Sequence, residues 1–99
     1  MKRLTTPKLT FELPFDKTII EKIRLTFKQS DTIIFVKESD QLRWEDNMVT
    51  VKLTQAETQQ LSPTILQMEL HILTTGGDSL KSDPISVCVE DVLNDEVLE

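Results

Sequence analysis

The strongest constraint on the fold of this chain is the alternation of apolar and polar residues across residues 49–77. Val49, Val51 and Leu53 alternate with polar residues, which is the period-two pattern of a strand with one buried face. Residues 64–74 repeat this pattern over a longer run, and the apolar side chains of one face are Leu66, Met68, Leu70 and Ile72. A strand of that length is predicted to run through the middle of a sheet.

The segment between these two strands predicts a short helical turn. Thr54 and Glu57 have the spacing of a capping box, in which each side chain accepts a hydrogen bond from the backbone N–H of the other residue. Leu61 would close the turn onto the core. Pro63 ends it, because proline disfavours helical dihedrals in the residue before it. Two-sheet sandwiches commonly change sheets through such a corner.

Alternation and turn residues predict further strands on both sides of this unit, at residues 8–14, 23–28, 32–37, 42–44 and 85–90. The run 32–37 is apolar on both faces. We expect Ile33 and Phe35 to point inward, and a strand covered on both sides explains Ile34 and Val36 better than an exposed contact surface does. Residues 79–83 are predicted to continue the chain as a polar segment.

The turns between these strands contain residues that tolerate left-handed backbone. Asn47 can take a positive φ in the turn before Val49, and residues 75–78 hold both glycines of the chain. Short sequential strands joined by turns favour a sandwich over a closed barrel. The predicted fold is therefore all-β, an immunoglobulin-like two-sheet antiparallel β-sandwich of about seven strands with one short helical turn at a corner.

Length and charge limit the organisation of the chain and its partners. The 99 residues predict a single domain over residues 1–99, with a loose N-terminal arm at 1–6 and an acidic C-terminal tail at 92–99. The net charge of -6 repels phosphate backbones and anionic lipid headgroups, so we expect no nucleic-acid and no membrane partner. No apolar run has the length of a signal peptide or of a membrane span.

The residues that could carry chemistry are few. Cys88 is the only cysteine and His71 the only histidine, so an internal disulfide is impossible and a cysteine nucleophile would need these two residues to meet across strands. We interpret Cys88 as a half-buried inert thiol and His71 as a solvated strand residue. Four loop carboxylates lack the order of a calcium loop, and they belong to Glu38, Asp40, Glu45 and Asp46. We assign no catalytic, cofactor-binding or metal-binding residue.

A family resemblance adds to this interpretation. The stretches LTQAETQQL and QMELHILTTGGDSLKSDPISVCVEDVL, together with the early Leu13-Pro14-Phe15-Asp16, span most of the chain. They resemble small proteins encoded among phage and prophage structural genes of Gram-positive bacteria and, more distantly, the N-terminal domain of phage upper baseplate proteins. The resemblance implies an immunoglobulin-like module without catalytic residues.

The sequence thus suggests two functions. The first is a non-enzymatic structural or assembly module of a phage or prophage, associated with a tail, baseplate or capsid and able to form homo-oligomers. The second is a cytosolic adaptor or regulatory domain that binds a peptide at an exposed sheet edge. We expect the protein in the bacterial cytoplasm or incorporated into a virion, and we expect contact through a sheet edge or through the tail at 92–99.

Overall fold

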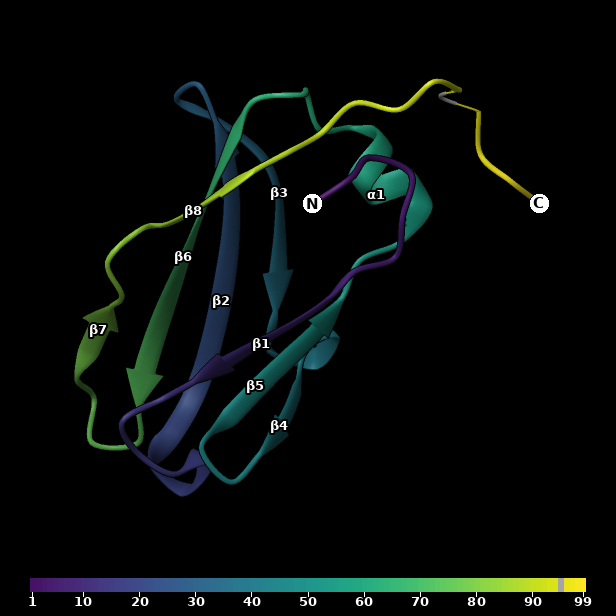
Figure 1. Ribbon diagram of the computed structural model, residues 1–99. Helices are drawn as coiled ribbons and strands as arrows, with labels where there is room; N and C mark the ends of the chain where they lie inside the picture. The colour runs from purple at the N-terminus through teal and green to yellow at the C-terminus, as the bar shows by residue number, and fades with distance from the viewer. Residues whose placement is uncertain (95) are drawn as a thin grey trace.

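A computed structural model describes residues 1–94 and 96–99 as two packed antiparallel sheets (Figure 1). The smaller sheet has the order β1-β5-β4, with β1 at Lys8–Glu12, β5 at Met48–Lys52 and β4 at Arg43–Glu45. The larger sheet has the order β3-β2-β6-β7. The strand β8 also pairs with β6, on the same edge as β7 but at the opposite end of β6. Its strands are β2 at Ile20–Gln29, β3 at Thr32–Glu38, β6 at Ile65–Thr74, β7 at Ser79–Lys81 and β8 at Ile85–Cys88.

The predicted all-β sandwich is confirmed, and its strand order has one specific feature. In an immunoglobulin constant-type domain the second strand lies in the sheet of the first and fifth strands. Here β2 lies between β3 and β6 instead. The larger sheet is consequently four strands wide and the smaller sheet only three, so the two sheets do not cover each other completely.

The core lies between the sheets and follows the predicted alternation. Ile23, Leu25 and Phe27 of β2 are almost fully buried and stand opposite Ile72, Leu70 and Met68 of β6. The facing sheet contributes the buried side chains of Val49, Val51 and Leu53, as the sequence predicts. Removing these apolar surfaces from water is the dominant favourable contribution to folding.

The strand β3 departs from the predicted phase because of a β-bulge. Phe27 pairs with Phe35 but Lys28 pairs with Ile33, so Ile34 is an extra residue on β3. Phe35 points inward as predicted, and its ring centroid lies 4.5 Å from that of Phe27. The prediction for Ile33 is wrong, because the bulge turns this side chain to the outer face, where it is 59% exposed.

Left-handed backbone occurs in the turns after β2, β4 and β6, and in one of them it lies at a residue other than the predicted one. In the hairpin between β4 and β5 the positive φ of 51° belongs to Asp46 and not to Asn47. The Asn47 side-chain amide instead donates a hydrogen bond to the Leu13 carbonyl. In the turn between β6 and β7, Gly77 has a φ of 88°. This turn leads into β7, a strand that the sequence did not predict and whose three residues are all exposed.

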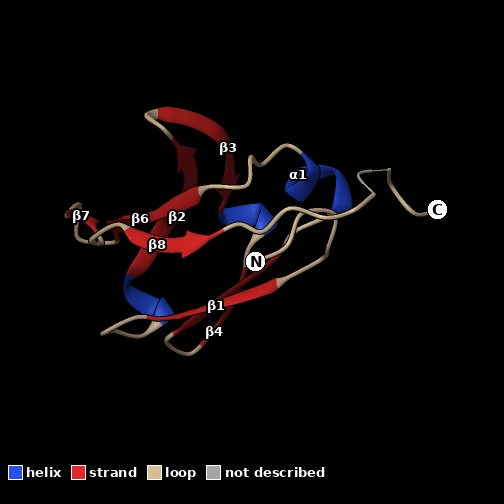
Figure 2. Cartoon of the chain, turned by 45° about the horizontal axis from the view of Figure 1, so that its top comes forward, coloured by secondary structure: helices blue, strands red, loops and turns tan. Residues whose placement is uncertain are grey.

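The predicted helical corner is present as α1 at Gln55–Gln59. The Thr54 hydroxyl accepts from the Glu57 N–H at 3.1 Å, and the Glu57 carboxylate accepts from the Thr54 N–H at 2.9 Å. Leu61 is buried below the turn, as expected. Two further one-turn 3-10 helices, η1 at Lys17–Ile19 and η2 at Ser39–Gln41, connect strands (Figure 2). Among the described residues no helix has the length and apolar character needed to cross a membrane.

The N-terminal arm is docked on the domain rather than loose. Arg3 donates one guanidinium hydrogen bond to the Gln59 carbonyl and another to the Asp91 carboxylate. The Thr5 N–H donates to the hydroxyl of Thr58, which is fully buried and donates back to the Thr5 carbonyl. Because these bonds join residues distant in the sequence, no local pattern predicts them.

An ion pair joins α1 to β3 beneath this corner. The Lys37 ammonium contacts the Glu57 carboxylate, and both side chains are mostly buried. Burial acts to raise the pKa of Glu57, but hydrogen bonds from Lys37 and from the Thr54 N–H outweigh it, so the pKa lies below its ordinary value. The ionised form of Glu57 is therefore the one that stabilises the fold.

We expect Thr54→Ala to lower the free energy of unfolding by about 1 kcal/mol, because it removes the oxygen that accepts from the Glu57 N–H. Chemical denaturation monitored by circular dichroism measures this change. Thr50→Ala is the matched control, because Thr50 lies in the middle of β5 and caps no helix. Equal losses in the two variants would contradict a specific capping role for Thr54.

We expect Glu57→Gln to lower the free energy of unfolding at neutral pH by roughly 1.5–3 kcal/mol, the range for a hydrogen bond to a charged group. Because the folded pKa of Glu57 is depressed, this contribution is present above the unfolded pKa of about 4.3 and is lost as pH falls through the folded pKa. Denaturation at a series of pH values should therefore show a smaller acid loss in Glu57→Gln than in the wild type. Glu69→Gln is the control, since its carboxylate lies 3.7 Å from an exposed Lys81. Parallel pH curves for the wild type and Glu57→Gln would refute the role of Glu57.

Candidate functional site

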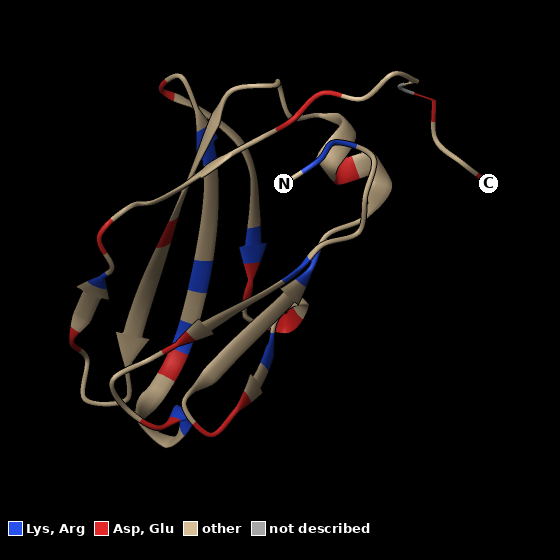
Figure 3. Cartoon of the chain, in the orientation of Figure 1, with Lys and Arg blue, Asp and Glu red and all other residues tan. Residues whose placement is uncertain are grey.

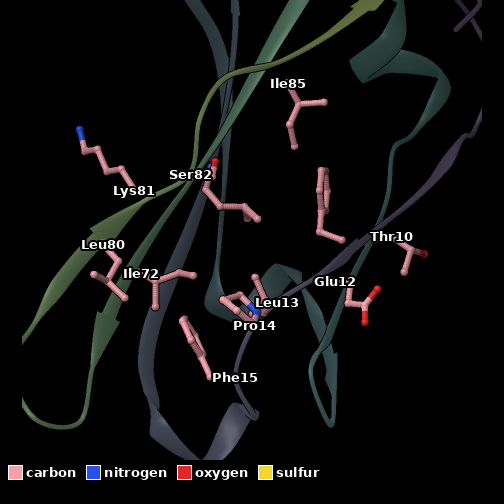
Figure 4. Close-up of a pocket in the computed structure, with 12 residues that line it drawn as sticks. Thr10, Glu12, Leu13, Pro14, Phe15, Ile72, Leu80, Lys81, Ser82 and Ile85 are labelled. Carbon is pink, nitrogen blue, oxygen red and sulfur yellow. The ribbon is translucent and has the colours of Figure 1, made fainter.

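The unequal widths of the two sheets leave a groove of about 550 Å³ beside β1. One wall is β1 with the loop that follows it, and the other wall comes from β6, β7 and β8 (Figure 4). The groove is lined by Thr10, Phe11, Glu12, Leu13, Pro14, Phe15, Leu70, Ile72, Leu80, Lys81, Ser82 and Ile85. It opens into the space between the sheets, so its floor is part of the core.

The lining of this groove is mainly apolar. Leu70 and Ile72 form buried floor, whereas Leu80 is 43% exposed and Ile85 is 37% exposed at the rim. Single exposed apolar residues are common on protein surfaces, but here they adjoin buried core in one concave surface. The Ser82 hydroxyl accepts from the Leu70 N–H, so this polar group serves the fold. The groove therefore offers chiefly apolar contact area to a partner.

The backbone of β1 faces this groove with an open edge. The Leu13 N–H donates to the Asn47 carbonyl, and the Leu53 N–H donates to the Pro7 carbonyl. Hydrogen-bonded and non-hydrogen-bonded residue pairs alternate along an antiparallel ladder. The odd-numbered residues of β1 are therefore the ones whose backbone groups bond to β5. The N–H and C=O groups of Lys8, Thr10 and Glu12 consequently point away from β5 and towards the groove side.

The strand edge across the groove is covered in part by the N-terminal arm. The Val89 N–H donates to the Thr64 carbonyl. The backbone groups of the next residue, Glu90, therefore point to the opposite side of the strand, where the Glu90 N–H donates to the Met1 carbonyl. The Arg3 N–H donates to the Glu90 carbonyl, and Lys2 forms a parallel bridge with Glu90. An edge covered in this way is protected from pairing with another chain, whereas the edge of β1 is open.

The only histidine and the only cysteine do not form a site together. His71 belongs to β6 and Cys88 to β8, which pairs with β6, but His71 stands opposite Lys81 of β7 whereas Cys88 stands opposite Ile65 of β6. Six residues of extended strand separate these positions, which corresponds to roughly 20 Å. Cys88 is exposed and not half-buried as predicted, because its position in β8 lies on the outer face. His71 lies 2.7 Å from the Ser79 hydroxyl through its Nε2.

The loop carboxylates considered for metal binding are spread over the surface. Glu38 accepts from Arg24 and Glu45 accepts from Arg43, so both acids have cationic neighbours instead of one another. Asp46 occupies the left-handed position of its turn. Within residues 1–94 and 96–99, no group of three or more His, Cys, Asp and Glu residues could hold a metal ion.

The tail passes over α1 and leaves apolar side chains exposed. The Gln55 side chain donates to the Leu98 carbonyl and accepts from the Leu98 N–H. Val92 is half-buried, whereas the Leu93 and Leu98 side chains are largely exposed. Gln55 thus ties the end of the tail to α1, and Leu93 and Leu98 remain accessible.

No protein family, no curated protein and no solved structure matches this chain. The support for the candidate site therefore comes from the geometry of the groove and of the β1 edge. Sequence reasoning identified the inward residues of β1 and β6 but not the groove between them. The one local signal was Leu80, a single large apolar residue within the polar run at 78–83.

We expect Leu80→Lys to reduce the binding of an apolar fluorescent dye severalfold, because a charge at the rim makes the groove less apolar. Fluorescence titration of the folded protein measures this change. Ile33→Lys is the matched control, since Ile33 is more exposed than Leu80 and lies outside the groove. Both variants should keep their stability within about 0.5 kcal/mol, as exposed positions usually do. Equal dye binding by all three proteins would show that the groove is not an accessible apolar site.

Proposed function

We propose that the protein is a non-enzymatic structural or assembly module of a phage or prophage, associated with a tail, baseplate or capsid. The observation that carries the proposal is the apolar groove beside the open edge of β1. Apolar side chains and unpaired backbone groups are the components of a protein contact. The resemblance to proteins encoded among phage structural genes supports the choice of a virion assembly as the setting.

The physical argument for protein contact is that the groove and the edge act together. An open edge alone can add any extended chain, and natural proteins usually blunt such edges. An apolar groove beside the edge adds selectivity, because only side chains that fill the groove gain the free energy of burial. Acidic surface charge keeps this contact away from nucleic acid and anionic lipid.

The alternative function is a cytosolic adaptor of the bacterial host that binds a peptide at the same edge. The groove favours both functions equally, since peptide addition to a strand uses the same backbone groups. The two differ in where the protein is found. A virion module is incorporated into particles or their assembly intermediates, whereas an adaptor stays in the soluble cytoplasm. Genes for virion proteins on both sides of its own gene would favour the first.

We expect the full-length protein to sediment with phage particles or their assembly intermediates after prophage induction, because the groove contacts another virion component. Gradient fractionation followed by immunodetection measures this association. Leu80→Lys should reduce it, while Ile33→Lys should leave it unchanged. Deletion of residues 92–99 tests whether the exposed leucines of the tail make a separate contact.

Recovery of the full-length protein only in soluble fractions would contradict the virion function and favour the adaptor. Association that is lost on deletion of the tail but unaffected by Leu80→Lys would place the contact on the tail and not in the groove. In each experiment, circular dichroism of the purified variant verifies that the fold is intact.

A further inference from the structure

The outer face of β1 carries an asymmetric arrangement of charge. Lys8 lies at one end of the strand, Thr10 at its centre and Glu12 at the other end (Figure 3). These three residues are also the ones whose backbone groups point to the open edge. Any strand added there therefore has its own residues directly opposite a cation, a hydroxyl and an anion in turn.

The charge at Lys8 is poorly matched within the domain. Lys8 stands opposite Lys52 of β5, in a non-hydrogen-bonded pair where side chains approach closely. Like charges directly opposite one another are destabilising. Lys8 has no ion pair among the residues described here. An acidic side chain on the open side of Lys8 would offset this repulsion.

The charge at Glu12 is likewise incompletely satisfied. Glu12 stands opposite the uncharged Met48, and its only side-chain hydrogen bond from a described residue comes from the Asn47 amide at a long 3.4 Å. A basic side chain on the open side of Glu12 would supply the missing counter-charge. The edge therefore favours an acidic residue at one end of an added strand and a basic residue at the other end.

The groove determines the shape of the occupant. The far side of the groove from β1 is the wall that β6, β7 and β8 form, so the open edge faces a bounded space. A whole sheet brought up to β1 would meet that far side, whereas a single extended segment fits between the two walls. Residues opposite Leu9 and Phe11 point inward on such a segment, towards Leu80 and Ile85.

We propose that the groove binds one extended segment of a partner protein, which adds to β1 as an antiparallel strand with the pattern basic, apolar, uncharged, apolar, acidic. The basic residue lies opposite Glu12 and the acidic residue opposite Lys8. Antiparallel pairing is slightly more stable per residue than parallel pairing. This inference rests on the proposed function, since it names the partner chemistry of the same groove.

The direct test is to measure the binding of two synthetic peptides to the purified protein by isothermal titration calorimetry. One has the core Lys-Leu-Thr-Phe-Glu, and the other has the same core with its two charges exchanged. We expect the first to bind about fivefold more tightly, as two cross-strand charge pairs would give. In the double variant K8E/E12K the preference should reverse. Wild-type preference for the exchanged peptide, or no preference in either protein, would overturn the proposal.

Thr10→Pro tests the edge itself. The Thr10 N–H points away from β5, so proline removes no bond of the β1-β5 ladder but removes the central donor of the open edge. We expect peptide binding to be lost in Thr10→Pro and kept in Thr10→Val, with both variants folded by circular dichroism. Unchanged binding in a folded Thr10→Pro would exclude strand addition at β1. Should Thr10→Pro not fold, the charge exchange remains decisive.

The sequence of β1 itself fits the proposed pattern, so a second copy of the chain is the competing occupant. Sedimentation velocity distinguishes the two: a wild-type dimer that Thr10→Pro makes monomeric would overturn the single-segment proposal. The proposed function and the proposed strand pattern can fail independently of each other. Peptide binding without particle association refutes the virion function alone, and particle association sensitive to Leu80→Lys without peptide binding refutes the strand pattern alone.

Discussion

The pairing of β2 with β6 is the interaction on which the other elements depend. Both strands have ten residues, and their inward side chains stand opposite one another along most of that length. Because β2 also pairs with β3, its position fixes three neighbouring strands of the larger sheet. Because β7 and β8 pair with the other edge of β6, β1, β5 and β4 are left for the facing sheet. The groove beside β1 is thus a consequence of where β2 lies, and the loop after β1 completes one of its walls.

The alternation of residues predicted most strands, because the period-two pattern records which face of a strand is buried. Burial of Leu25, Leu70 and Val51 follows from local sequence alone. The bulge at Ile34 could not be predicted in this way, since the run 32–37 is apolar at successive positions and matches either phase. The strand β7 was missed for a different reason: its three residues are all exposed, and a single apolar residue, Leu80, is too short a pattern to predict a strand.

The groove itself depends on which strands are neighbours, and that information is not local. Residues of β1 and β7 are separated by about two thirds of the chain, and each segment alone gives no sign of the other. The docked arm is a similar case, because the Arg3 and Thr5 contacts join the N-terminus to α1 and to the segment after β8. Residues at the ends of a chain are often poorly ordered unless such bonds hold them. Sequence patterns thus predicted the layers of this fold, whereas its pairing order produced the candidate site.

The open edge of β1 is short, and this length controls how a partner can bind. Pro14 is the next outward-directed position after Glu12, and it cannot donate a backbone hydrogen bond to an added chain. Within Lys8–Glu12 only three residues direct their backbone groups outward. Each backbone hydrogen bond contributes only modestly to the free energy of binding. A ladder this short therefore gives little affinity by itself. Affinity must come mainly from apolar side chains buried in the groove, and the charges at Lys8 and Glu12 then select the register.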